Sequence, residues 1–226
     1  MAIKTVTYSK DKKLSAHFSL KEFKCSASNT IKYSEETIAL LEKVFDKCPN
    51  ISKAIITSGY RTPEYSVSIG GTKDDGHTVG IAVDSKWYDK DNNLLSPKYI
   101  ACIAQDLGFT GIGIMKTSIH LDTRTTKNYK NGKWWGDETN GKSGITDFYS
   151  YFKLSKAEVY KVLGIENKTA VEPKKTDIIE VKEESKAEET KTETTAEDMV
   201  KENANVIVRF FKFLIELFNK IKGEQK

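Results

Sequence analysis

The sequence predicts an α+β fold: a small, mainly antiparallel sheet with flanking helices, then a linker and a separate amphipathic helix. Up to residue 165, short runs of β-branched residues alternate with segments of helical hydrophobic periodicity. Charged and small polar residues then dominate, and apolar residues return only near the C-terminus. We therefore divide the chain into an N-terminal arm at 1–13, a folded domain at 14–165, a disordered linker at 166–198 and a helix at 199–226.

The first part of the chain is expected to supply two helices and a strand. The polar residues 1–13 are expected to be loosely held, and 18–23 is predicted as a short helix. Ser34 suits a helix N-cap, since the acidic residues behind it favour the positive end of the helix dipole. The apolar residues of that helix have helical spacing, and the β-branched run 51–58 predicts a strand after it. Glycines then mark an irregular segment that leads to His77.

The second part is expected to add three strands and three helices. A strand at 80–87 places Ala82 and Asp84 on one face, because side chains alternate along a strand. Ser96-Pro97 opens a helix that ends at Gly108. Residues 111–115 and 118–123 are predicted to form a hairpin, and its second strand should lie beside the strand that carries Asp84. Short helices at 148–152 and 156–163 close the domain.

Two of the three histidines lie in motifs that suggest a metal site. His77 and Asp84 are separated by small residues, and His120 is followed two positions later by Asp122. On a strand, His120 and Asp122 point to the same face. Two imidazoles and one carboxylate suit Zn²⁺, and three protein ligands leave the fourth position open for water, which is the arrangement of catalytic zinc sites.

The pattern His-x-x-Gly-x-Ala-x-Asp followed by His-x-Asp resembles the zinc D-Ala-D-Ala carboxypeptidase family. This family includes phage endolysins and vancomycin-resistance dipeptidases, and it shares its fold with the hedgehog signalling domain. The resemblance runs from about Leu14 to Trp135 and includes Thr57-Ser-Gly-Tyr-Arg-Thr-Pro-Glu64 and Gly111-Ile-Gly-Ile114. It implies that the zinc ligands are His77, Asp84 and His120.

The catalytic residues are less well defined by the motifs. Several branches of the family carry an acid just before the second histidine, where this chain has Thr117 and Ser118. Asp122 is our candidate general base, since a strand places it on the face of His120. Its alternative role is to orient His120 or to pair with Arg124. Asp75, which stands where many relatives have serine, is a second candidate.

Substrate contacts are predicted at an arginine and at two tryptophans. The planar fork of Arg61 can hold a carboxylate through two hydrogen bonds, or stabilise an oxyanion. Trp134 and Trp135 form a stacking edge for sugar or peptide, or else one of them belongs to the core. The resemblance implies cleavage next to D-alanine, or between L-alanine and D-glutamate. The rival interpretations are a zinc-bearing but inactive wall-binding module and a virion or membrane-associated structural protein.

Charge and cysteine usage restrict the partners and the place of action. The linker carries a net charge of −5, which leaves +9 on the rest of the chain and suits an anionic polymer such as cell wall. No aromatic-basic motif for nucleic acid is present, so nucleic acid is not expected. The three scattered cysteines suggest reduced thiols, and the first residues lack the apolar core of a signal peptide. We expect a protein made in the cytoplasm that reaches the wall by phage-type release or in a virion.

The last segment has more apolar surface than a free helix can leave in water. Between 205 and 221, polar residues occupy only a narrow stripe, with spacings of three and four residues. The segment is too short and too charged to span a bilayer, which takes about 20 apolar residues. It is expected to bind an anionic membrane surface, to join several chains, or to dock on its own domain.

Overall fold

The computed structural model describes residues 3–125 and 132–166. The helices are the 3-10 turn η1 (Leu20–Phe23), α1 (Glu35–Lys47), α2 (Pro63–Ser68), α3 (Gly76–Val79), α4 (Pro97–Leu107), α5 (Phe148–Phe152) and α6 (Lys156–Leu163). The strands are β1 (Ile3–Thr7), β2 (Thr30–Ser34), β3 (Ile51–Ser58), β4 (Ala82–Asp89), β5 (Gly111–Ile114), β6 (Ile119–Asp122), β7 (Trp134–Asp137) and β8 (Lys142–Ser143).

The central sheet has the strand order β3-β4-β6-β5-β7-β8, and only the pair β5–β7 is parallel. The predicted α+β class with a mainly antiparallel sheet is therefore confirmed. The predicted hairpin is formed by β5 and β6, whose turn is closed by a hydrogen bond of 3.0 Å from the Met115 amide to the Ser118 carbonyl. As expected, β6 lies beside β4, so that the motifs around Asp84 and His120 are on adjacent strands.

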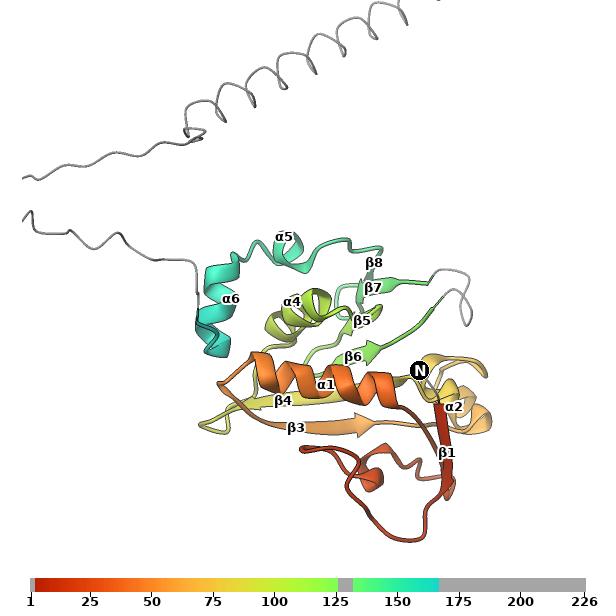
Figure 1. The fold of residues 1–226 in the computed structure, drawn as a ribbon. Coiled ribbons are helices and arrows are strands. Elements are labelled where there is room, and N and C mark those ends of the chain that lie inside the picture. Colours follow the sequence, from red (N-terminus) through yellow and green to blue (C-terminus); the bar gives the residue numbers. More distant parts are fainter. Residues whose placement is uncertain (1–2, 126–131, 167–226) are drawn as a thin grey trace, which may run out of the picture. The chain divides into compact units, whose positions relative to one another are not determined.

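One face of this sheet is covered by helices and forms the core. α1 and α4 lie near one another on this face (Figure 1), where they meet alternate residues of β4, β6 and β5. The ring of Phe45 in α1 packs 5.2 Å from that of Trp87 in β4. α5 is joined to α4 by the Gln105 side chain, which accepts a hydrogen bond of 2.7 Å from the Phe148 amide. The opposite face of the same strands is left for the functional site.

The structure differs from the sequence predictions in three places. Residues 1–13 are not simply a loose arm, since β1 pairs antiparallel with β2 over five residue pairs. The segment between 59 and 79, for which no helix was predicted, contains the short helices α2 and α3, each capped by a side chain. β7 was not predicted as a strand, because it is only four residues long and carries glycine and aspartate. Its pairing with β5 decides its conformation.

The predicted linker from 167 onward and the C-terminal amphipathic helix lie outside the described residues. Within the part of the chain that the structure describes, no helix has both the length and the apolar character needed to cross a membrane.

Candidate metal centre

His77 is placed by the short helix α3. Asp75 caps this helix, because its side chain accepts a hydrogen bond of 2.9 Å from the Thr78 amide and a second, short one from the Ser66 hydroxyl. Gly80 ends the helix with φ of 89°, a conformation that suits glycine. The buried His77 ring lies 2.8 Å from the Gly59 carbonyl through Nδ1. A carbonyl can only accept, so Nδ1 donates the proton and Nε2 presents its lone pair to the site.

Asp84 and His120 are direct cross-strand neighbours on β4 and β6. Because side chains on paired strands project from the same face at matched positions, both point to the face that the helices leave open. Nδ1 of His120 lies 3.0 Å from Oδ1 of Asp84. Strand register alone therefore brings together two residues that are 36 positions apart in the sequence.

Three candidate ligand atoms form a nearly equilateral triangle. Nε2 of His77 is 3.2 Å from Nδ1 of His120 and 3.3 Å from Oδ1 of Asp84, and the third side is 3.0 Å. Ligands bound to a tetrahedral zinc ion at about 2.0–2.2 Å lie about 3.3 Å from one another. The donor types and their spacing therefore fit Zn²⁺, and these three residues are the group in the described chain that could hold a metal ion.

Arg61 binds one carboxylate oxygen of Asp84, Oδ2, and so leaves Oδ1 facing the two histidines. The guanidinium donates a hydrogen bond of 2.7 Å to Oδ2 of Asp84, and its Nε donates to Ser58 at 2.9 Å. Burial raises the pKa of Asp84, but hydrogen bonds to His120 and His77 outweigh burial and hold that pKa far below its usual range. Arg61 thus acts on a candidate ligand, and the structure does not place it among the residues that line the neighbouring pocket. Its predicted role, in which it holds a substrate carboxylate or stabilises an oxyanion, stays a prediction.

Asp122 contacts the side of the His120 ring that points away from the other two candidate ligands. Its fully buried carboxylate lies 3.0 Å from Nε2 of His120, the ring nitrogen that faces away from Asp84. Arg124 donates to the same carboxylate from its backbone amide at 3.0 Å and from its guanidinium Nε at 2.9 Å. This arrangement favours the second of the two predicted roles, in which Asp122 orients His120 and leaves Nδ1 for the metal.

The pKa values of this pair reflect the same contacts. Burial raises the pKa of Asp122, but hydrogen bonds from His120 and Arg124 prevail and lower it. Burial lowers the pKa of His120, but the hydrogen bonds to Asp122 and Asp84 outweigh it and raise the pKa to about 9. A divalent cation at Nδ1 would replace the proton that these carboxylates favour.

Glycines on β5 leave the space that these side chains fill. Gly111 is paired with Asp122 and Gly113 with His120, so both glycines lie on the site face of the sheet. A Cβ atom at position 111 would overlap the carboxylate of Asp122. A glycine is therefore required at 111 for a buried carboxylate to fit behind His120.

Gly111→Ala is expected to displace Asp122 and to lower zinc affinity by on the order of 10–100-fold, the usual cost of losing the partner that orients a ligand. Competition with a chelating indicator measures the affinity. Ser118→Ala, on the same hairpin, is the control, since its hydroxyl meets only the sulfur of Met115 among the described contacts. An unchanged zinc affinity in Gly111→Ala would contradict the orienting role of Asp122.

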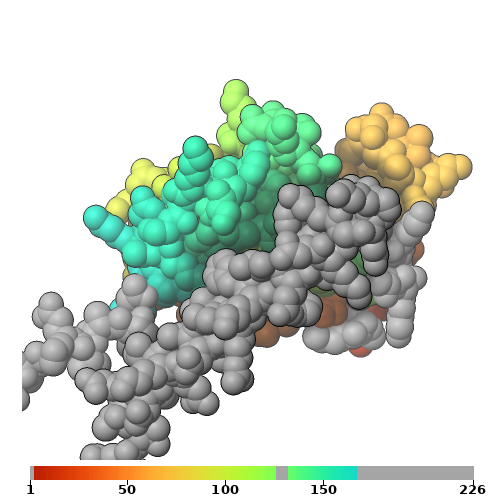
Figure 2. Space-filling view, turned by 90° about the horizontal axis from the view of Figure 1, so that it is seen from above, coloured from red at the N-terminus to blue at the C-terminus, as the bar shows by residue number. Residues whose placement is uncertain are grey.

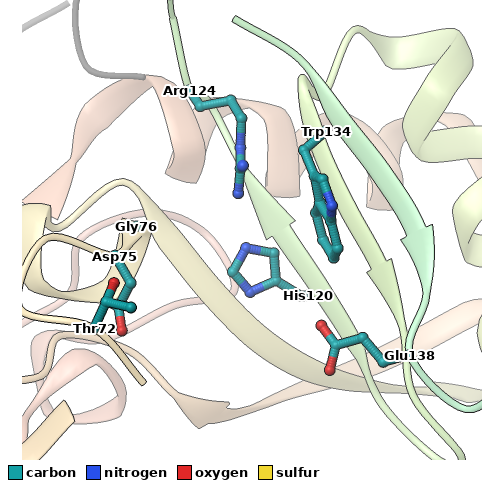
Figure 3. A pocket seen from close by; sticks show the side chains of 7 residues that line it. All are labelled: Thr72, Asp75, Gly76, His120, Arg124, Trp134 and Glu138. Carbon is teal, nitrogen blue, oxygen red and sulfur yellow. The ribbon is translucent and has the colours of Figure 1, made fainter. Parts of the chain in front are cut away.

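A pocket of about 450 Å³ opens beside His120. Its lining comes from two sides. One side is the segment that leads into α3, and the other is formed by strands β6 and β7 and the residues that directly follow them. Figure 3 shows these side chains around the His120 ring, namely Thr72, Asp75, Gly76, Arg124, Trp134 and Glu138. In the space-filling view the segment around α2 forms a raised lobe at one side of the strand region (Figure 2).

The two tryptophans have different environments. Trp134 lines the pocket, with its ring 6.2 Å from that of His120 and nearly perpendicular to it, and with the Arg124 guanidinium 5.3 Å from its ring. Trp135 points to the other face, where it is 8% exposed, stacks on Phe148 and donates to the Phe109 carbonyl at 3.2 Å. Alternation along β7 places Trp135 in the core, which favours the second sequence interpretation, in which one of the two tryptophans belongs to the core.

Sequence reasoning did not single out Thr72 or Glu138 as site residues, and it considered Arg124 only as a partner of Asp122. The available signal was the spacing of Trp134, Gly136 and Glu138, which places all three on one face if the segment is extended. That signal depends on recognising β7 as a strand.

A zinc-type ligand triangle that opens onto a pocket defines the class of the protein as a metal-dependent hydrolase. Residues 16–122, which contain all three candidate ligands, match the family model described as Peptidase M15. This match identifies residues 16–122 as a domain of the zinc D-Ala-D-Ala carboxypeptidase family, and together with the ligand triangle it supports a zinc-dependent peptidase with a peptide or peptidoglycan substrate. No curated protein and no solved structure matches the chain.

Proposed function

We propose that this protein hydrolyses a peptide bond in the stem peptide of peptidoglycan, and that it is a D-Ala-D-Ala carboxypeptidase. The observation that carries the proposal is the ligand triangle of His77, Asp84 and His120 beside a pocket that is lined by both a cation and a half-buried aromatic ring. When bound, zinc lowers the pKa of a coordinated water to about 7 and polarises a carbonyl oxygen.

The chain's own residues hold the site and orient the substrate. Arg61 fixes one oxygen of Asp84, and Asp122 fixes the ring of His120, so the ligand atoms keep their geometry without substrate. Arg124 brings a positive charge to the pocket wall, where it would attract the carboxylate of a peptide terminus. The ring of Trp134 offers an apolar surface against which an alanine methyl or a peptide plane can pack.

The same cation supports a second candidate, an L-alanyl-D-glutamate endopeptidase. In both bonds the residue after the scissile bond has D configuration and carries a free α-carboxylate. Arg124 would meet that carboxylate in either case, so the proposal of a carboxypeptidase rests on the family resemblance as well as on the pocket. The two activities differ in what they release.

Digestion of purified muropeptides with the zinc-loaded protein tests the proposal. We expect pentapeptide substrates to lose one alanine, as detected by mass, and we expect a chelator to abolish the reaction and added zinc to restore it. A new amino terminus at D-glutamate would instead identify the endopeptidase. If fully zinc-loaded protein releases no product from several wall types, the chain is a wall-binding module or a structural protein, and the proposed activity is wrong.

A further inference from the structure

The catalytic acid that the family resemblance places before His120 is missing, since β5 and β6 are joined through Met115, Lys116, Thr117 and Ser118. We propose that Glu138, which follows β7 on the far side of β5, is the catalytic residue that takes the proton from the attacking water. This inference rests on the proposed peptidase activity and names a residue of the same site.

The other three carboxylates near the candidate ligands are already bound by other side chains or by backbone amides. Asp84 faces both histidines with one oxygen and Arg61 with the other. Asp122 is fully buried behind His120 and is bound by Arg124. Asp75 accepts from the Thr78 amide with one oxygen and from the Ser66 hydroxyl with the other, which are structural contacts of the α3 cap.

Glu138 is different from these three. It is exposed and lines the pocket together with His120, and its carboxylate points toward the His120 ring (Figure 3). Within residues 3–125 and 132–166, its side chain takes part in no hydrogen bond or ion pair. The neighbouring Asp137, by contrast, is buried on the other face and accepts hydrogen bonds from Asn140 and Tyr151. Of the two adjacent acids, only Glu138 has a carboxylate available for chemistry.

The backbone of Glu138 is held in a fixed position relative to His120. Its amide donates a hydrogen bond of 2.8 Å to the Ile114 carbonyl at the end of β5. Strand register then places His120, Gly113 and Gly136 in one row across β6, β5 and β7. Trp134, Gly136 and Glu138 follow one another at alternate positions and so face the same side as His120.

Gly113 in this row keeps the space beside the Glu138 carboxylate open. A Cβ atom at Gly113 would lie 3.0 Å from a carboxylate oxygen of Glu138 and 2.8 Å from the Trp134 ring. Paired Cβ positions on neighbouring strands are about 4.5–5.5 Å apart. The Glu138 carboxylate therefore lies over Gly113, which is the direct cross-strand neighbour of His120.

The proton transfer is balanced without another reactant. Water attacks the scissile carbonyl carbon, a C–O bond forms, and Glu138 accepts the proton that the water loses. As the C–N bond breaks, Glu138 gives that proton to the leaving amine and returns to its carboxylate form. The products are a carboxylic acid and an amine, and the enzyme is unchanged.

Glu138→Gln in the full chain tests the inference, with Glu166→Gln as the matched control, because Glu166 is an exposed carboxylate after α6. We expect Glu138→Gln to keep about one zinc per chain, as one three-ligand site requires. We expect its turnover on the muropeptide cleaved by the parent to fall on the order of 10²–10⁴-fold, the usual contribution of general acid–base catalysis. Binding of an uncleavable muropeptide analogue, measured calorimetrically, should change little, while Glu138→Asp should recover part of the turnover.

Each contrary result has its own meaning. Turnover of Glu138→Gln close to that of Glu166→Gln overturns the assignment of Glu138 and leaves the peptidase activity established. Loss of zinc or of analogue binding in Glu138→Gln also overturns it, since the residue would then support the site or hold the substrate. An inactive parent that carries zinc overturns the proposed function and this inference with it.

Discussion

Asp84→Asn and Asp84→Ala are expected to lose bound zinc, and with it all chelator-sensitive peptidase activity. Asp84 supplies the carboxylate corner of the ligand triangle, 3.0 Å and 3.3 Å from the two histidine nitrogens. Its removal also leaves the guanidinium of Arg61, which is 16% exposed, without its carboxylate partner. Loss of a ligand should exceed the roughly 10–100-fold loss of affinity that follows from removing a residue that orients one.

Metal analysis of the purified variants measures this effect, alongside His77→Ala and His120→Ala. Asp91→Asn is a suitable control, because it neutralises an exposed aspartate in the turn after β4. Full zinc retention in both histidine variants would show that the site has been assigned to the wrong residues.

Asp122→Asn is expected to weaken zinc binding by roughly 10–100-fold, because the amide no longer fixes the ring of His120 with a negative charge at Nε2. It should also destabilise the domain by about 3–5 kcal/mol, since the ion pair between the buried Asp122 carboxylate and Arg124 is broken. Urea unfolding in the presence of a chelator isolates the second effect, and indicator competition measures the first.

Removing both charges separates the two roles of Asp122. The double variant Asp122→Asn, Arg124→Leu should recover part of the stability, because a guanidinium no longer faces a buried neutral amide at position 122. It should not recover zinc affinity, since His120 still lacks its carboxylate. If Asp122→Asn instead keeps its zinc affinity and loses only turnover, Asp122 acts on the substrate directly, as the first of the two sequence interpretations had it.

The sequence by itself determined the fold class and the candidate ligands. Periodicity located α1 and α4, because their apolar faces are long enough to show a pattern, and a run of β-branched residues located β3. The motifs around His77, Asp84 and His120 carry residue types that bind zinc, and their resemblance to the family pattern implied which of them are the ligands.

Only the tertiary structure decided what the surrounding residues do. Asp122 shares the face of His120 on β6, as predicted, but whether it faces the substrate or the interior depends on Gly111 on a neighbouring strand. Trp134 and Trp135 are adjacent and alike in sequence, and strand alternation sends one to the pocket and the other to the core. Glu138 is brought near His120 by the parallel pairing of β5 with β7, a long-range contact that no local pattern encodes. Ligand identity is a property of short motifs, whereas the direction in which a charged side chain points is set by its neighbours across the sheet.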